Sequence, residues 1–123
     1  MIIADFYING PIPRTAPYKK FRSHLYVPAD VKKWRSKIAK AFSRLPGFKP
    51  PEAGERVMVD TTWKFIKNHC DVDSIYHSLQ DALSKDALHV SDKHWSHTAI
   101  INWPFVDKKA QEGVHIVVVY TQA

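Results

Sequence analysis

The sequence is poor in the features that mark secreted and membrane-spanning proteins. It has one cysteine, Cys70, which excludes an internal disulfide and a cysteine-rich zinc module and favours a reducing cytoplasm. No apolar run follows a basic start, and no run approaches the length that crosses a bilayer. We therefore expect a cytoplasmic protein with no membrane partner. The chain also has no internal repeat and no low-complexity tract.

Acidic residues are few compared with basic ones. The chain has 12 Asp and Glu against 18 Lys and Arg, which gives a formal net charge of +6. This balance favours a polyanionic partner, with nucleic acid ahead of an anionic membrane. At 123 residues, with 45% hydrophobic residues and four Trp, the chain is expected to be a packed globule of one domain, residues 1–123.

Hydrophobic periodicity predicts an α+β fold. The expected elements are a strand at 2–9, a helix at 29–44, a strand at 56–66, a helix from about 72 to 83, and strands at 97–106 and 114–121. The order β-α-β-α-β-β predicts a mixed sheet of about four strands with both helices on one face. Right-handed crossovers make the strand–helix–strand units parallel. The polar segment between the last two strands contains Gly113 and predicts a hairpin.

Three aspartates are the candidate metal ligands. Asp71 and Asp73 follow the strand at 56–66 directly, and Asp92 lies in a short loop beyond the next helix. If these carboxylates converge, they need a cation, and hard oxygen ligands suit Mg²⁺ or Mn²⁺. In isolation, Asp71 is better explained as a helix N-cap, and Asp73 as an acid matched to the helix dipole; Asp92 is what favours a metal site.

The same part of the chain offers two alternatives to a three-aspartate site, a calcium-binding EF-hand loop and a zinc site. An EF-hand loop requires an oxygen side chain and then a glycine where this chain has Ile75 and Tyr76, so that motif is excluded. A zinc site is possible by ligand type, but the spacing matches no closed structural site; its ligands would be His89, His94, His97 and Cys70.

The same stretch resembles the signature of the RusA family of Holliday junction resolvases. The matching segments are D-V-D-S at 71–74, D-A-L-S-K-D at 81–86 and S-D at 91–92. The resemblance implies a RusA-like fold and a homodimer that resolves four-way DNA junctions by paired symmetric nicks. It also implies an Mg²⁺-dependent endodeoxyribonuclease whose metal ligands and catalytic acids are Asp71, Asp73 and Asp92.

His77 departs from the family pattern, because the resemblance implies a functional lysine at this position. A histidine can serve there when protonated, or as a general acid–base near neutral pH, so His77 is a catalytic candidate. The alternative is a surface histidine paired with Asp73 or Asp81. Ser91 also replaces a common second acid. Two other functions therefore stay open: a catalytically weakened junction- or DNA-binding module, and a divergent nuclease acting on flaps or duplex.

Basic residues interleaved with aromatic ones suggest where DNA binds. The residues expected to contact DNA are Arg14, Lys19, Lys20, Arg22, Lys67 and Lys85. Four of them lie in the proline-rich loop 10–28, and the resemblance implies an N-terminal basic loop of this kind. The alternative is a solvated loop whose aromatic rings pack on the core. The helix at 29–44 also has a basic face, which is either simply solvated or attracts the DNA backbone diffusely.

Overall fold

The computed structural model describes residues 2–13, 19–21, 24–66, 72–90, 95–101 and 105–122. Its strands are β1 (Ile2–Asn9), β2 (Lys19–Phe21), β3 (His24–Tyr26), β4 (Glu55–Lys64), β5 (Trp95–Ile101) and β6 (Gly113–Gln122). Its helices are α1 (Ala29–Ser43), α2 (Val72–Asp81), the π-helical turn η1 (Ala82–Ala87) and the 3₁₀ turn η3 (Lys109–Gln111).

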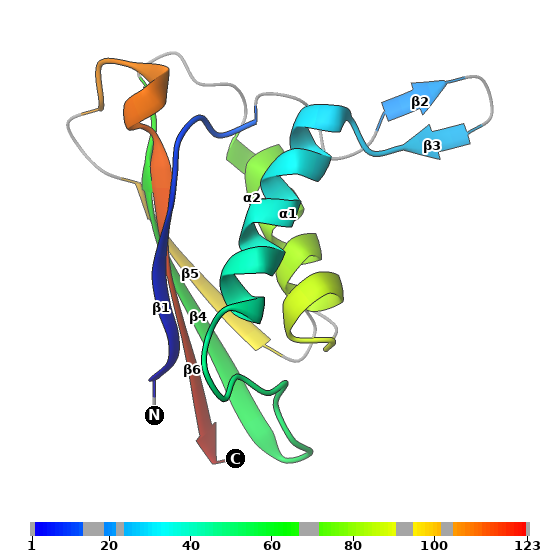
Figure 1. Ribbon diagram of the computed structural model, residues 1–123, viewed down its shortest axis with the longest axis vertical. Coiled ribbons are helices and arrows are strands. Elements are labelled where there is room, and N and C mark those ends of the chain that lie inside the picture. Colours follow the sequence, from blue (N-terminus) through cyan, green and yellow to red (C-terminus); the bar gives the residue numbers. More distant parts are fainter. Residues whose placement is uncertain are drawn as a thin grey trace.

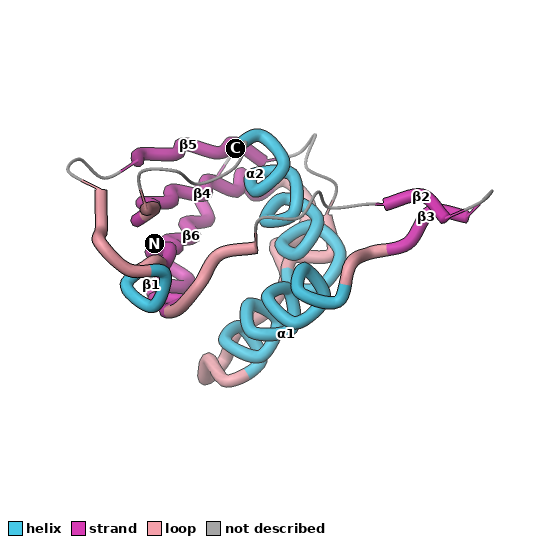
Figure 2. The backbone as a smooth tube through the Cα atoms, turned by 90° about the horizontal axis from the view of Figure 1, so that it is seen from above, coloured by secondary structure: helices cyan, strands magenta, loops and turns pink. Residues whose placement is uncertain are grey.

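The main sheet is mixed and has the strand order β1-β6-β4-β5. β6 pairs antiparallel with both β1 and β4, whereas β4 and β5 are parallel neighbours joined through α2. Both long helices lie on one side of this sheet (Figures 1 and 2). The α+β class, the four-stranded mixed sheet and the two-helix layer are therefore confirmed.

The predicted hairpin of the last two long strands is wrong. β4 lies between β5 and β6, so these two strands have no shared ladder in the described chain. The α2 crossover places β5 on one edge of β4, and the other edge of β4 takes β6 over ten register pairs, from Glu55 to Lys64. A hairpin does form where only a loop was predicted. β2 and β3 form a separate two-stranded sheet that extends away from the helices (Figure 1).

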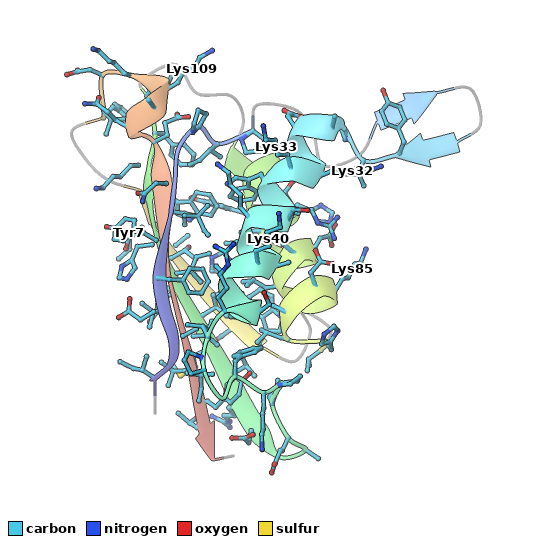
Figure 3. All side chains as sticks on the ribbon, in the orientation of Figure 1. Tyr7, Lys32, Lys33, Lys40, Lys85 and Lys109 are labelled. Carbon is cyan, nitrogen blue, oxygen red and sulfur yellow. The ribbon has the colours of Figure 1, made fainter. Side chains whose placement is uncertain are left out.

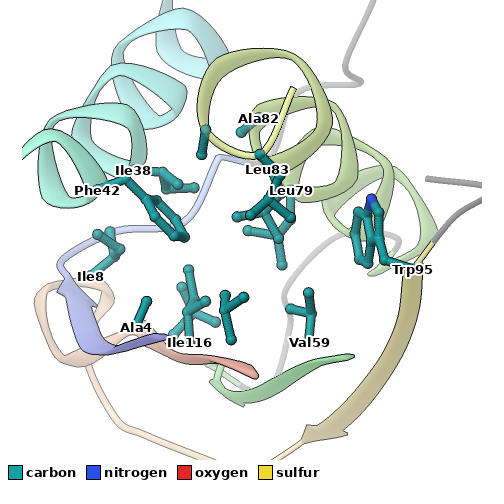
Figure 4. Packing of buried hydrophobic residues seen from close by; sticks show 14 of the residues in the cluster. Ala4, Ile8, Ile38, Phe42, Val59, Leu79, Ala82, Leu83, Trp95 and Ile116 are labelled. Carbon is teal, nitrogen blue, oxygen red and sulfur yellow. The ribbon is translucent and has the colours of Figure 1, made fainter. Parts of the chain in front are cut away.

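Alternation along β4 builds the core as the sequence predicts. Val57, Val59, Thr61 and Trp63 are buried on the helix side, and intervening residues such as Met58 lie on the other face. From α1 the buried residues are Val31, Trp34, Ile38 and Phe42, which follow the helical period. Except for Val31 and Thr61, these buried side chains belong to one hydrophobic cluster between sheet and helices (Figure 4). No helix of the described chain is long and apolar enough to cross a membrane.

Candidate nucleic-acid interface

The junction between β4 and α2 is the place where the sequence predicts metal-binding acids. β4 ends at Lys64, Ile66 forms an isolated bridge with Val106, and α2 begins at Val72. A helix therefore opens within the D-V-D-S segment, as expected. Asp71 lies outside the described residues, and Asp73 is in the first turn of α2 with its side chain undescribed.

The remaining predicted residues fall into three groups. Arg14, Arg22, Lys67 and Asp92 lie outside the described residues, and Lys19 and Lys20 are placed on β2 by their backbone alone. His77 and Lys85 are described in full. Within the described ranges, no group of three His, Cys, Asp or Glu side chains is close enough together to hold a metal ion.

The length of the helix formed by α2 and η1 bears on the predicted metal site, because this helix separates the D-V-D-S segment from the Asp92 loop in the sequence. The ten residues of α2 and the six of η1 form one continuous helix of roughly 20 Å. β5 then begins beside Val57, at the start of β4, while the end of β4 pairs with Ile101. Val72 and Val90 therefore lie at opposite ends of this helix (Figure 1). Asp71 directly precedes Val72 in the sequence and Asp92 follows Val90 by two positions, and both lie outside the described residues.

One face of α2 and η1 carries a ladder of charges at helical spacing. His77, Asp81 and Lys85 follow one another at intervals of four residues. The Asp81 Oδ1 atom lies 3.8 Å from Nε2 of His77 and 3.9 Å from Nζ of Lys85. His77 and Lys85 are more than half exposed, whereas Asp81 is only 14% exposed. Asp81 thus lies between two solvent-exposed groups, the imidazole of His77 and the ammonium of Lys85, along one face of the helix.

Lys85 also lines a basic groove between α1 and η1, the α1–η1 groove. It has a volume of about 600 Å³, its charged lining residues are Lys32, Arg35, Lys85 and Asp86, and His89 also lines it. The Arg35 guanidinium pairs with Asp86 at 3.2 Å, which leaves Lys32 and Lys85 as its other formal charges. Lys32 and Lys85 lie on the same side of the helix layer in Figure 3. This surface suits a phosphate backbone better than a neutral ligand.

The π-helical turn shapes the lower end of this groove. The N–H of Leu88 donates to the carbonyl of Leu83 at 2.7 Å, one residue further back than in an α-helix. His89 follows in the left-handed region with φ of 54° and ends the helix. Leu83 and Leu88 are fully buried, so the wide turn presses apolar side chains inward and leaves His89 exposed at the groove.

Glu112 is a buried carboxylate that sequence reasoning missed. It is only 1% exposed. Its Oε1 accepts the N–H of Ile12 at 3.2 Å, and its Oε2 accepts the N–H of Ile66 at 3.0 Å. Glu112 therefore ties the start of the N-terminal basic loop to the segment that leads into Asp71. The only local signal is an acid that immediately precedes Gly113 and an apolar strand. This pattern by itself is typical of a turn.

A polar network lies beneath α2 in the core. Thr61 Oγ1 is 2.8 Å from Nε2 of His97 and accepts the indole N–H of Trp63 at 2.7 Å. The rings of Tyr76 and Trp95 each lie 6.0 Å from the His97 ring. Burial lowers the pKa of His97 below its usual value, and the negative charge of Asp60 opposes part of that shift.

This lowered pKa predicts a loss of stability in mild acid. The unfolded chain takes up a proton near pH 6.5, whereas folded His97 resists it, so the unfolded state binds more protons in that window. The contribution is present above about pH 6.5 and is lost as pH falls through the folded pKa. Urea unfolding between pH 7.5 and 5 should show a smaller acid loss for His97→Gln than for the exposed control His89→Gln. Equal losses would contradict this role.

In comparisons with known proteins, no family model matches the chain, and no curated protein matches it.

Proposed function

We propose that the protein is a metal-dependent, RusA-like endonuclease that acts on four-way DNA junctions as a homodimer. The observation that carries the proposal is the D-V-D-S segment at 71–74, within which α2 opens after β4. It is supported by the net charge of +6 and by the basic α1–η1 groove on the same helix. Acids beside a phosphate-attracting surface suit hydrolysis of a phosphodiester.

Oxygen ligands from Asp71, Asp73 and Asp92 would hold Mg²⁺ or Mn²⁺. When bound, the metal supplies positive charge that activates a water nucleophile and stabilises the negative charge developing on the phosphate. His77, exposed on the outer face of α2, would offer a proton to the leaving oxygen or, when protonated, a positive charge to the phosphate. Lys85, eight residues further along that face, would hold the DNA backbone.

A homodimer would also allow the metal ligands to come from two subunits, so that one chain need not supply acids from both ends of this helix. Since Val72 and Val90 lie at opposite ends of one helix, the partner subunit's Asp92 can complete a site that Asp71 and Asp73 begin. Two-fold symmetry would then give one complete site for each of two opposing strands. Mixing Asp71→Asn with Asp92→Asn subunits tests this arrangement. Mixed dimers regain one intact site if Asp92 acts across the dimer, and regain none if it acts within its own chain.

Cleavage of a synthetic mobile four-way junction is the decisive test of the proposed function. We expect paired symmetric nicks with Mg²⁺ or Mn²⁺ and none with EDTA. A linear duplex of equal length at the same salt is the matched substrate, because phosphate-driven binding varies steeply with salt. Equal cleavage of both substrates would favour a divergent flap or duplex nuclease instead. Absence of nicking with either metal would contradict the nuclease.

The second candidate is a junction- or DNA-binding module without catalysis. The observation that favours it is His77, which lies 3.8 Å from Asp81 in an ordinary helix pair and stands where the family resemblance implies a lysine. Tight junction binding without nicking would select this function. The variant His77→Lys then asks whether restoring the lysine restores cleavage.

Lys85→Ala is expected to weaken DNA binding about threefold to tenfold at low salt. It should also reduce the salt slope by about one, because one phosphate contact is removed. Fluorescence anisotropy of a labelled junction measures both quantities. Lys49→Ala removes the same charge from an exposed position that does not line the α1–η1 groove, and should change binding less than twofold. Equal effects of the two substitutions would argue against the groove.

A further inference from the structure

A second cavity lies on the other flank of α1, between the turn that follows β1, the first turns of α1, and η3. Its volume is about 360 Å³. Ile12, Pro13 and Trp34 form its apolar part; Ile12 and Trp34 are at least 97% buried. Lys33, Lys37 and Lys109 also line it. Figure 3 shows Lys33 and Lys109 near the same end of the molecule.

The charge around this cavity is unbalanced. Lys33 and Lys37 are one helical turn apart on α1, and Lys109 comes from η3 in the last third of the chain. Among the described residues, Asp30 is the only acid that lines the cavity, and its Oδ1 accepts the N–H of Val31 at 2.9 Å. Three ammonium groups thus face one carboxylate. None of these three lysines forms an ion pair with a residue of the described chain. Such a concentration of positive charge attracts an anion.

The indole of Trp34 is a second unusual feature of this part of α1. Its indole Nε1 is buried, and no acceptor for its N–H is present among the described residues. A buried donor without an acceptor is costly, so most such groups in folded proteins are paired. Trp34 lines this same cavity. An oxygen-rich anion bound in the cavity would balance the charge of the three lysines.

The walls of the cavity are held in place before any ligand arrives. Buried Glu112 accepts the N–H of Ile12, and its carbonyl accepts the N–H of Gly10 at 2.9 Å. Gly10 has φ of 104°, and a Cβ built there would lie 3.5 Å from Nζ of Lys37. On the opposite wall, Gln111 accepts the N–H of Asp107 and the N–H of Lys108, which fixes the turn that carries Lys109.

We propose that this cavity binds a phosphate group of a nucleic-acid strand. A phosphodiester brings negative charge and several acceptor oxygens, and dispersed lysines bind phosphate as point charges. The net charge of +6 and the α1–η1 groove on the other flank of α1 favour a polyanion that crosses this helix over a free phosphate. The inference rests on DNA as the partner, but it does not rest on cleavage.

The indole resonance of Trp34 gives a readout confined to this site. We expect its ¹H–¹⁵N peak, assigned by its absence in Trp34→Phe, to shift when a short DNA duplex is titrated without divalent metal. The shift should persist in Asp71→Asn, which separates this inference from the nuclease. An unmoved peak at saturating DNA would overturn the proposal. A shift with inorganic phosphate but not with DNA would overturn the nucleic-acid source.

Charge removal provides the second readout. The double variant Lys37→Ala/Lys109→Ala should weaken duplex binding about tenfold or more and lower the salt slope by about one, because one phosphate contact is lost. Lys40→Ala is the matched control, since Lys40 is an exposed lysine of α1 that lines neither cavity. We expect less than about a twofold effect from it. A double variant that binds DNA as Lys40→Ala does, with unchanged circular dichroism, would also overturn the proposal.

Discussion

Asp71→Asn is expected to lower junction cleavage about a thousandfold while leaving junction binding intact or stronger. The carboxylate would hold the metal, whose charge stabilisation is worth several kcal/mol, and each 1.4 kcal/mol changes a rate about tenfold. Binding should survive, because the substitution also removes a negative charge that repels phosphate. Single-turnover cleavage with saturating Mg²⁺ and gel-shift binding with EDTA measure the two effects separately.

Asp60→Asn is the matched control for this substitution. Asp60 is exposed on β4, on the sheet face that the helices do not cover, so its loss should leave cleavage within about twofold. If Asp71→Asn lost binding and cleavage together, a structural role at the start of α2 would explain it, and the ligand role would be contradicted. Full activity in Asp71→Asn would exclude the acid from the site altogether.

Trp63→Ala is expected to lower the free energy of unfolding by about 3–5 kcal/mol. Trp63 is fully buried near the end of the inner strand β4, and its ring centroid lies 6.1 Å from Trp34, 5.6 Å from Phe65 and 5.3 Å from Tyr76. Alanine would leave a cavity among these rings. It would also remove the indole N–H that Thr61 accepts. Because small domains are stable by only about 5–15 kcal/mol, much of the chain's stability is at stake.

Equilibrium urea unfolding, followed by circular dichroism, measures this loss. Trp63→Phe keeps an aromatic ring but removes the N–H, and should cost clearly less than alanine. Met58→Ala removes a large apolar side chain that is 45% exposed on the same strand, and should cost less than about 1 kcal/mol. Similar losses for Trp63→Ala and Met58→Ala would contradict the assignment of Trp63 to the centre of the core.

Local periodicity accounts for the parts of the fold that sequence reasoning predicted correctly. The two-residue alternation along β4 and the 3.6-residue spacing along α1 identify each buried face without knowledge of the rest of the chain. Strand pairing is different, because a strand with one buried face can form hydrogen bonds with any of several other strands. β6 has no local feature that selects β1 and β4 over β5, so the hairpin prediction failed.

Some features of the candidate site likewise follow from the local sequence, and others depend on tertiary packing. The D-V-D-S segment, the opening of α2 and the exposure of Lys85 follow from spacing along one stretch of sequence. The α1–η1 groove does not, because it joins Lys32 and Arg35 to residues about fifty positions later. The position of each lysine relative to a cavity also depends on how the two helices pack, and charge counts alone do not give it.

The sequence by itself determined which segments become the two long helices and the four strands of the main sheet, which of their faces are buried, and the basic character of the molecule. Only the tertiary structure decided the strand order, the burial of Glu112, and the meeting of Lys33 and Lys37 with Lys109. The physical reason is distance along the chain. Periodicity reports interactions within a few residues, whereas these features depend on contacts between segments that folding alone brings together.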